Sequence, residues 1–136
     1  MAVDVGHAFP PKPFYVDPTR VEEFVTALGV DPEPGFAPRA GAPVPPGFLM
    51  YVTAYGADAV HDAFDLPWHR ALFGGTRYEF LAPVRVGDTV TVRPTVTGRT
   101  VRGALVFWEL TSEYCDAGGA VAVRETSITI DRTGDG

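Results

Sequence analysis

The chain has 136 residues, of which 46% are hydrophobic and 12% aromatic, and its formal net charge is −6. These values predict one domain, residues 1–136, with a hydrophobic core of its own, and they argue against disorder. The acidic balance excludes a nucleic-acid footprint, which needs clustered positive charge, and the single Cys115 excludes an internal disulfide and a multi-cysteine metal site.

No apolar run approaches the roughly 18 residues of a membrane span. The N-terminus lacks the basic and then apolar pattern of a secretion signal. The sequence therefore predicts a cytoplasmic protein with no membrane partner. We also expect no metal and no cofactor.

The first thirteen residues end in "HAFPPKP" and predict an extended segment on the surface, because their prolines exclude a helix or a central strand. The next stretch, "FYVDPTRVEEFVTALG", predicts a short strand, a turn and a helix. Asp17 caps this helix, Pro18 takes its first position and Gly29 ends it. The helix has one apolar face, formed by Val21, Phe24, Val25 and Leu28.

Residues 30–46 are rich in Pro and Gly and predict an ordered loop. A loop of this length in a small domain is more often functional than idle. Residues 48–64 are apolar on most faces, so the sequence predicts a buried helix over about residues 47–64.

From Phe73 onward, apolar residues recur at every second position, which predicts an antiparallel sheet built mainly from residues 73–131. The sequences "VRG" at 101–103 and "CDAGG" at 115–119 predict the turns between its strands. One long central helix wrapped by a curved antiparallel sheet is the hot-dog fold, an α+β architecture. Its open strand edges predict a dimer in which two sheets join edge to edge.

The stretch "FLAPVRVGDTVTVRPTV" resembles a strand signature of MaoC-like hydratases and dehydratases, in which an aromatic-rich strand runs into Pro-x-x-x-Gly-Asp-Thr. The chain is most similar to the MaoC-like dehydratase N-terminal family, also described as FAS1-like dehydratases, and the likeness extends from Tyr15 to Ile130. This family includes the non-catalytic partner subunits of heteromeric (R)-specific enoyl-CoA hydratases. The resemblance implies a hot-dog domain that acts on an acyl thioester.

Active members of the wider superfamily carry Asp-x-Asn-Pro-x-His in the loop before the hot-dog helix. The Asp and His together supply the base for water and the proton for the α-carbon, which hydration of an enoyl thioester needs. The segment "GVDPEPGF" places Asp31 on the Asp and Pro34 on the Pro, but Phe36 falls on the His. Phenylalanine cannot transfer a proton, so the resemblance implies a broken dyad. Asp31 also fits an ordinary turn.

Active members begin the buried helix with His-Gly-Met-Leu, whereas this chain reads Pro-Gly-Phe-Leu at residues 46–49. The N–H of Gly47 could face a thioester oxygen at the start of the helix. Equally, Gly47 could serve only to let the helix start pack closely against the sheet.

Six further residues are candidates for binding the substrate. Gly74 and Gly75 would allow a thioester or pantetheine to approach the backbone, although a β-bulge is the commoner reason for such glycines. Tyr51 on the predicted helix more simply packs against the sheet. Arg77, with Arg85 and Arg93, is a candidate for the phosphates of coenzyme A, and a solvated sheet face is the alternative.

The sequence thus favours a hot-dog subunit that completes an acyl-binding cleft with a catalytic MaoC-like partner. The carrier of the acyl group could be coenzyme A or acyl carrier protein. One alternative is a self-sufficient homodimeric hydratase that uses Asp31 with another acid such as His69. A hot-dog thioesterase with Asp58 or Asp62 as its carboxylate, and a non-catalytic acyl-thioester binding protein, also stay open.

Overall fold

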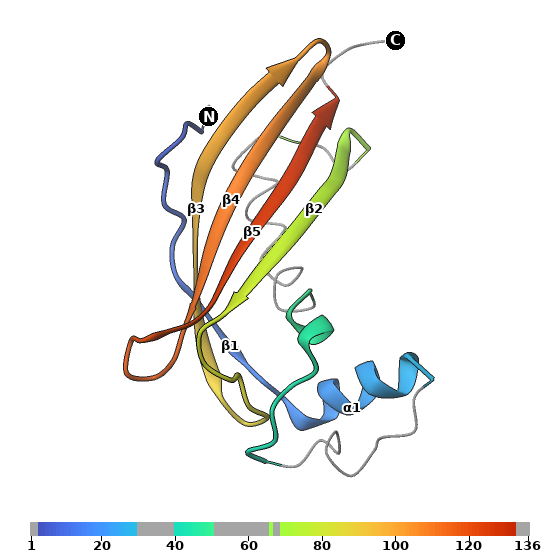
Figure 1. Ribbon diagram of the computed structural model, residues 1–136, viewed down its shortest axis with the longest axis vertical. Helices are drawn as coiled ribbons and strands as arrows, with labels where there is room; N and C mark the ends of the chain where they lie inside the picture. The colour runs from blue at the N-terminus through green and yellow to red at the C-terminus, as the bar shows by residue number, and fades with distance from the viewer. Residues whose placement is uncertain (1–2, 30–39, 51–65, 67–68, 133–136) are drawn as a thin grey trace.

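The computed structural model describes residues 3–29, 40–50, 66 and 69–132. Five strands form one antiparallel sheet in the order β1-β3-β4-β5-β2, and the helical elements α1 and η1 lie near one end of it (Figure 1). The elements are β1 (Lys12–Tyr15), α1 (Pro18–Ala27), the 3₁₀ helix η1 (Pro46–Phe48), β2 (Ala71–Phe80), β3 (Thr89–Arg102), β4 (Leu105–Cys115) and β5 (Val121–Arg132). The antiparallel sheet predicted from the alternating pattern is confirmed.

Helix α1 begins and ends as the sequence predicts. The carboxylate of Asp17 accepts a hydrogen bond of 2.7 Å from the N–H of Thr19, and Pro18 follows at the first helical position. Gly29, just beyond the last turn, has a φ of 70°, which glycine adopts at little cost. The prediction for Leu28 is wrong: its side chain is 59% exposed, so the apolar face is limited to the residues before it.

The turns between the long strands also agree with the sequence. Gly103, with a φ of 59°, lies in the two-residue connection between β3 and β4. In the β4–β5 turn, one carboxylate oxygen of Asp116 accepts hydrogen bonds from the N–H groups of Gly118 and Ala120. Cys115 is the buried last residue of β4.

The N-terminal segment is partly buried and is hydrogen-bonded to β3. Val3 and Phe9 are buried and form a second small core with Val96 and Leu110. Backbone hydrogen bonds connect residues 6–9 to β3, for example from Gly6 N–H to the carbonyl of Val96 at 2.8 Å. The prediction that residues 1–13 only run over the surface is therefore wrong, because this segment covers the edge of β3 beyond β1.

The main core lies where α1, η1 and the segment before β3 meet the sheet. Its buried members include Phe48 and Leu49 of the η1 region, Val21 and Val25 of α1, and Val84, Val86, Val90, Tyr114 and Val123. Of the helix predicted over residues 47–64, the structure describes only the beginning. Residues 51–65 lie outside the described residues.

Candidate functional site

The loop and helix start around Gly47 form the part of the predicted site that the structure describes best. The ring of Phe48 packs edge-on against Phe24 of α1, with ring centroids 5.8 Å apart, and is fully buried. A Cβ atom on Gly47 would lie 3.2 Å from Cζ of Phe24. Close packing therefore explains why residue 47 is small, but the close neighbour is α1 and not the sheet that the sequence led us to expect.

Residues 40–45 fix the direction from which the chain enters η1. They run alongside residues 84–86, with hydrogen bonds from Gly41 N–H to the carbonyl of Val86 and from Val44 N–H to the carbonyl of Val84, both at 2.9 Å. The stretch of residues 84–86 in the family-like signature thus has a structural task. It holds the end of the long loop in place just before η1.

Several predicted site residues lie outside the described residues. These are Asp31 and Phe36 of the loop, and Tyr51, Asp58 and Asp62 of the predicted helix. The interpretation of these five positions therefore continues to depend on the sequence alone.

Gly74 and Gly75 form an irregularity in β2. The register of β2 against β5 shifts between Phe73 and Gly75, so Gly74 has no Cα partner and Gly75 adopts a φ of 145°. A Cβ atom on Gly74 would lie 2.7 Å from Cγ2 of Ile128. The bulge and the tight approach to β5 account for both glycines, and a role in substrate binding stays a prediction.

The three candidate phosphate-binding arginines have different surroundings. Arg85 is occupied, because its guanidinium donates a hydrogen bond of 2.9 Å to the carbonyl of Gly41. Arg93 is exposed on β3, opposite Glu113 of β4. Arg77 is exposed in the second half of β2, and its side chain has no hydrogen bond or ion pair with another described residue.

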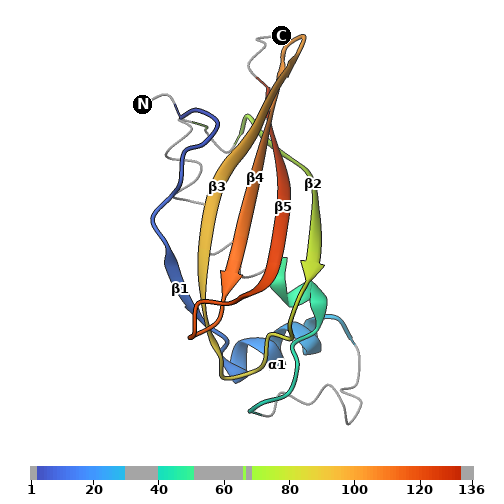
Figure 2. The ribbon, with the colours of Figure 1, turned by 60° about the vertical axis from the view of Figure 1, so that its left-hand side comes forward.

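His69 lies in an exposed turn directly before β2. Its carbonyl accepts a hydrogen bond of 3.0 Å from the guanidinium of Arg132, and the bidentate ion pair of Arg70 with Asp131 closes the same turn at 2.8 Å. Strand β2 begins near the β3–β4 hairpin and ends near η1 (Figures 1 and 2). Since a ten-residue strand spans roughly 30 Å, His69 and η1 lie near opposite ends of β2.

A buried polar group on the inner face of the sheet is the feature that the sequence analysis missed. Glu125 of β5 is 1% exposed. Its carboxylate accepts hydrogen bonds from the hydroxyl of Tyr114 and, at 3.3 Å, from the hydroxyl of Thr76. The signal was present in "AVAVRETSITI", where Glu125 has the same parity as the buried Val123.

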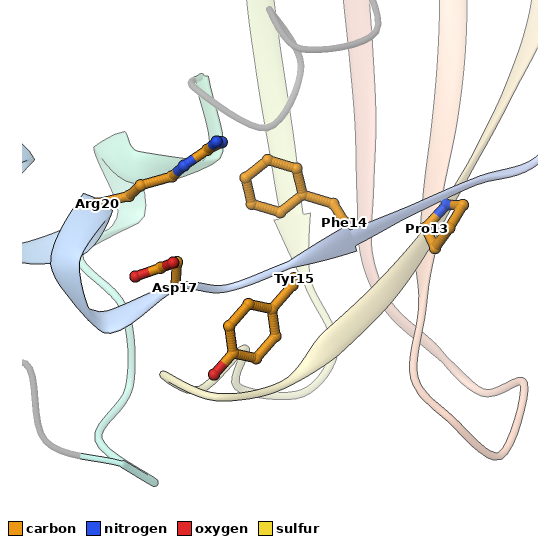
Figure 3. A pocket seen from close by; sticks show the side chains of 5 residues that line it. All are labelled: Pro13, Phe14, Tyr15, Asp17 and Arg20. Carbon is orange, nitrogen blue, oxygen red and sulfur yellow. The ribbon is translucent and has the colours of Figure 1, made fainter.

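A small hollow lies between β1 and α1, lined by Pro13, Phe14, Tyr15, Asp17 and Arg20 (Figure 3). Its volume of about 150 Å³ is well below the roughly 300–1,000 Å³ of typical ligand pockets. Asp17 is engaged as the cap of α1. We therefore do not assign this hollow to an acyl group.

The described part of the chain lacks two kinds of feature. There, His, Cys, Asp and Glu nowhere gather in a group of three or more that could hold a metal ion. No helix in the same part combines the length and the hydropathy that crossing a membrane requires.

Comparison with known proteins gives a consistent picture. The model of the "FAS1-like, dehydratase domain region" matches residues 3–125. A UPF0336 protein of Streptomyces griseus subsp. griseus is 32% identical over 110 residues, which cover 71% of this chain and 73% of the relative.

Two solved structures from Mycobacterium tuberculosis share the fold. The truncated HadBC complex, a (3R)-hydroxyacyl-ACP dehydratase, gives a TM-score of 0.81 at 17% identity, covering 96% of this chain and 99% of that one. The ChsH1-ChsH2 complex gives 0.63 at 23% identity, covering 97% and 100%. At these identities the likenesses show the fold alone, and with the antiparallel sheet they support the predicted hot-dog architecture.

Proposed function

Because the chain belongs to the FAS1-like dehydratase family of MaoC-like hot-dog proteins, we propose that it is a subunit of an enoyl-thioester hydratase or dehydratase. The observation that carries this proposal is the family match over residues 3–125. Hydration of an enoyl thioester needs a base for water, a proton donor for the α-carbon and hydrogen-bond donors for the thioester oxygen. The roles of individual residues follow from these three requirements.

This chain is the half that lacks a complete Asp–His dyad. Asp31 keeps the carboxylate of the motif, but Phe36 takes the place of the proton-carrying imidazole. The working Asp and His come from a partner MaoC-like chain with an intact Asp-x-Asn-Pro-x-His loop. His69, the alternative acid for catalysis, lies just before the start of β2, whereas η1 lies near the end of β2. This separation favours the accessory role over catalysis within one chain.

The acyl thioester, carried by coenzyme A or acyl carrier protein, binds in a cleft that this chain completes. The residues proposed to line it are Gly47, Tyr51, Gly74 and Gly75. Gly47 lies in η1 beside the core that α1 and Phe48 build, and its N–H is the proposed donor to the thioester oxygen. The reaction takes place in the cytoplasm.

Assembly through the sheet edge accompanies this function. Strand β2 lies at the edge of the sheet and carries exposed apolar side chains, which suit pairing with a second hot-dog chain. Two of the structural relatives, HadBC and ChsH1-ChsH2, are complexes of two differently named chains.

The test is turnover of an enoyl thioester by the purified chain, alone and mixed with a MaoC-like chain that carries the intact motif. We expect hydration by the mixture and little by the isolated chain. Hydration by the isolated chain at the rate of the mixture would establish the self-sufficient homodimer. Release of free thiol would instead establish a thioesterase, and binding without turnover in any mixture would establish an acyl-thioester binding protein.

A further inference from the structure

The outer edge of β2 is the open edge of the described sheet. At the other side, β1 and residues 6–9 cover the edge of β3. On β2, the backbone groups that face away from β5 pair with no other described strand (Figures 1 and 2). Phe73 and Phe80, near the two ends of β2, are 65% and 54% exposed. An edge of this kind is a template for another strand.

The exposed aromatic residues of β2 are arranged symmetrically about Arg77. Gly74 is the extra residue of the bulge and has no partner in β5. When Gly74 is left out, β2 has seven paired residues from Phe73 to Phe80, and Arg77 is the fourth of them. Phe73 and Phe80 both share a face with inward-directed residues of β5, since they pair with Thr129 and Val123.

This symmetry creates a conflict for two identical chains. Antiparallel pairing of two β2 strands about Arg77 would place Phe73 of each copy opposite Phe80 of the other. The same register would place Arg77 opposite Arg77 of the second copy, and like charges directly opposite each other are destabilising. A shift by two residues would bring Arg77 opposite Glu79 but would separate the aromatic pairs. Glu79 already accepts a hydrogen bond of 3.1 Å from Arg124 of its own chain.

We propose that the β2 edge selects a non-identical partner strand, one with an Asp or Glu opposite Arg77 and apolar residues opposite Phe73 and Phe80. The proposal rests on the proposed function, since the partner is the catalytic hot-dog chain. Arg77 suits this role because it is exposed and has no ion pair with another described residue. A carboxylate opposite Arg77 resolves the conflict and keeps the aromatic contacts. Arg77 thus acts as a determinant of heteromeric over homomeric assembly.

Two variants of this chain test the proposal without the natural partner. Wild type and Arg77→Glu, one of them tagged, are mixed in equal amounts, and the self-pairs and mixed pairs are measured by native mass spectrometry over a concentration series. We expect the dissociation constant of the mixed pair to be about tenfold lower than that of either self-pair, because a like-charge contact becomes an opposite-charge contact. Arg77→Thr removes the repulsion and should strengthen self-pairing over wild type.

The matched control is Arg93→Glu, an exposed charge reversal on β3, which β4 and β5 separate from β2. It should give mixed pairs and self-pairs in statistical proportion. The same result for Arg77→Glu, or a wild-type self-pair as tight as that of Arg77→Thr, would overturn the proposal. Pair formation is measured here without any substrate. Failure of this inference is therefore distinguishable from failure of the proposed hydratase function, which only turnover reveals.

Discussion

The hydroxyl group of Tyr114 on β4 donates a hydrogen bond to the carboxylate of Glu125 on β5, inside the core of the sheet's inner face. Both residues are less than 2% exposed. Thr76 of the edge strand β2 donates to the other oxygen of the same carboxylate. One buried side chain therefore connects three neighbouring strands, including the strand with the open edge.

Replacement of Tyr114 by phenylalanine should destabilise the protein through this carboxylate. The variant Tyr114→Phe removes one of the donors to a buried acid, and such a loss typically costs about 1–3 kcal/mol. The free energy of unfolding, measured by urea denaturation, should fall by that amount. Tyr15→Phe is the control, since Tyr15 is exposed on β1. Equal stability of the two variants would contradict a stabilising role for the Tyr114–Glu125 bond.

The bulge in β2 should tolerate no side chain at Gly74. In Gly74→Ala the new Cβ would lie 2.7 Å from Cγ2 of Ile128, closer than real contacts allow, so β2 or Ile128 must move. Overpacking of this kind costs about 1–3 kcal/mol. Gly118→Ala in the exposed β4–β5 turn is the control, because its Cβ would lie 3.4 Å from Asp116. Denaturation midpoints that fall equally for both variants would count against a tight bulge.

The ion pair before β2 should matter more than the ion pairs on the open sheet surface. Asp131 is nearly buried and receives three hydrogen bonds from Arg70, two of them from one nitrogen. Arg70→Gln should therefore lower the free energy of unfolding by more than about 1 kcal/mol. Arg124→Gln should lower it by less than about 1 kcal/mol, as exposed pairs do, because Arg124 and both of its partners are substantially exposed. The reverse order in thermal or urea unfolding would refute this ranking.

Features encoded locally were predictable from the sequence. The cap at Asp17, the end of α1 at Gly29 and the turns at Gly103 and Asp116 each depend on a few neighbouring residues. The alternation of apolar residues likewise predicted the antiparallel sheet, because burial of one face imposes a period of two.

Features that depend on distant parts of the chain were not predictable. Val3 and Phe9 are buried because the N-terminal segment pairs with β3, about 90 residues later. The partner of Glu125 depends on the register of β4 against β5, in which Tyr114 is opposite Val123 and reaches Glu125 diagonally. The central position of Arg77 becomes visible only once Gly74 is known to be a bulge.

The accessory role of this chain is tested most directly by the hydration rate of an enoyl thioester with wild type and Asp31→Asn, each alone and each with the catalytic partner. Because Phe36 replaces the imidazole, the isolated wild type should be slower than the heteromer by at least about 10², the usual contribution of a positioned acid or base. Asp31→Asn should change the heteromer's rate by less than about twofold, since the working dyad lies in the partner. Substantial activity of the isolated wild type that disappears in Asp31→Asn would mean that this chain is itself the catalyst and would contradict the account.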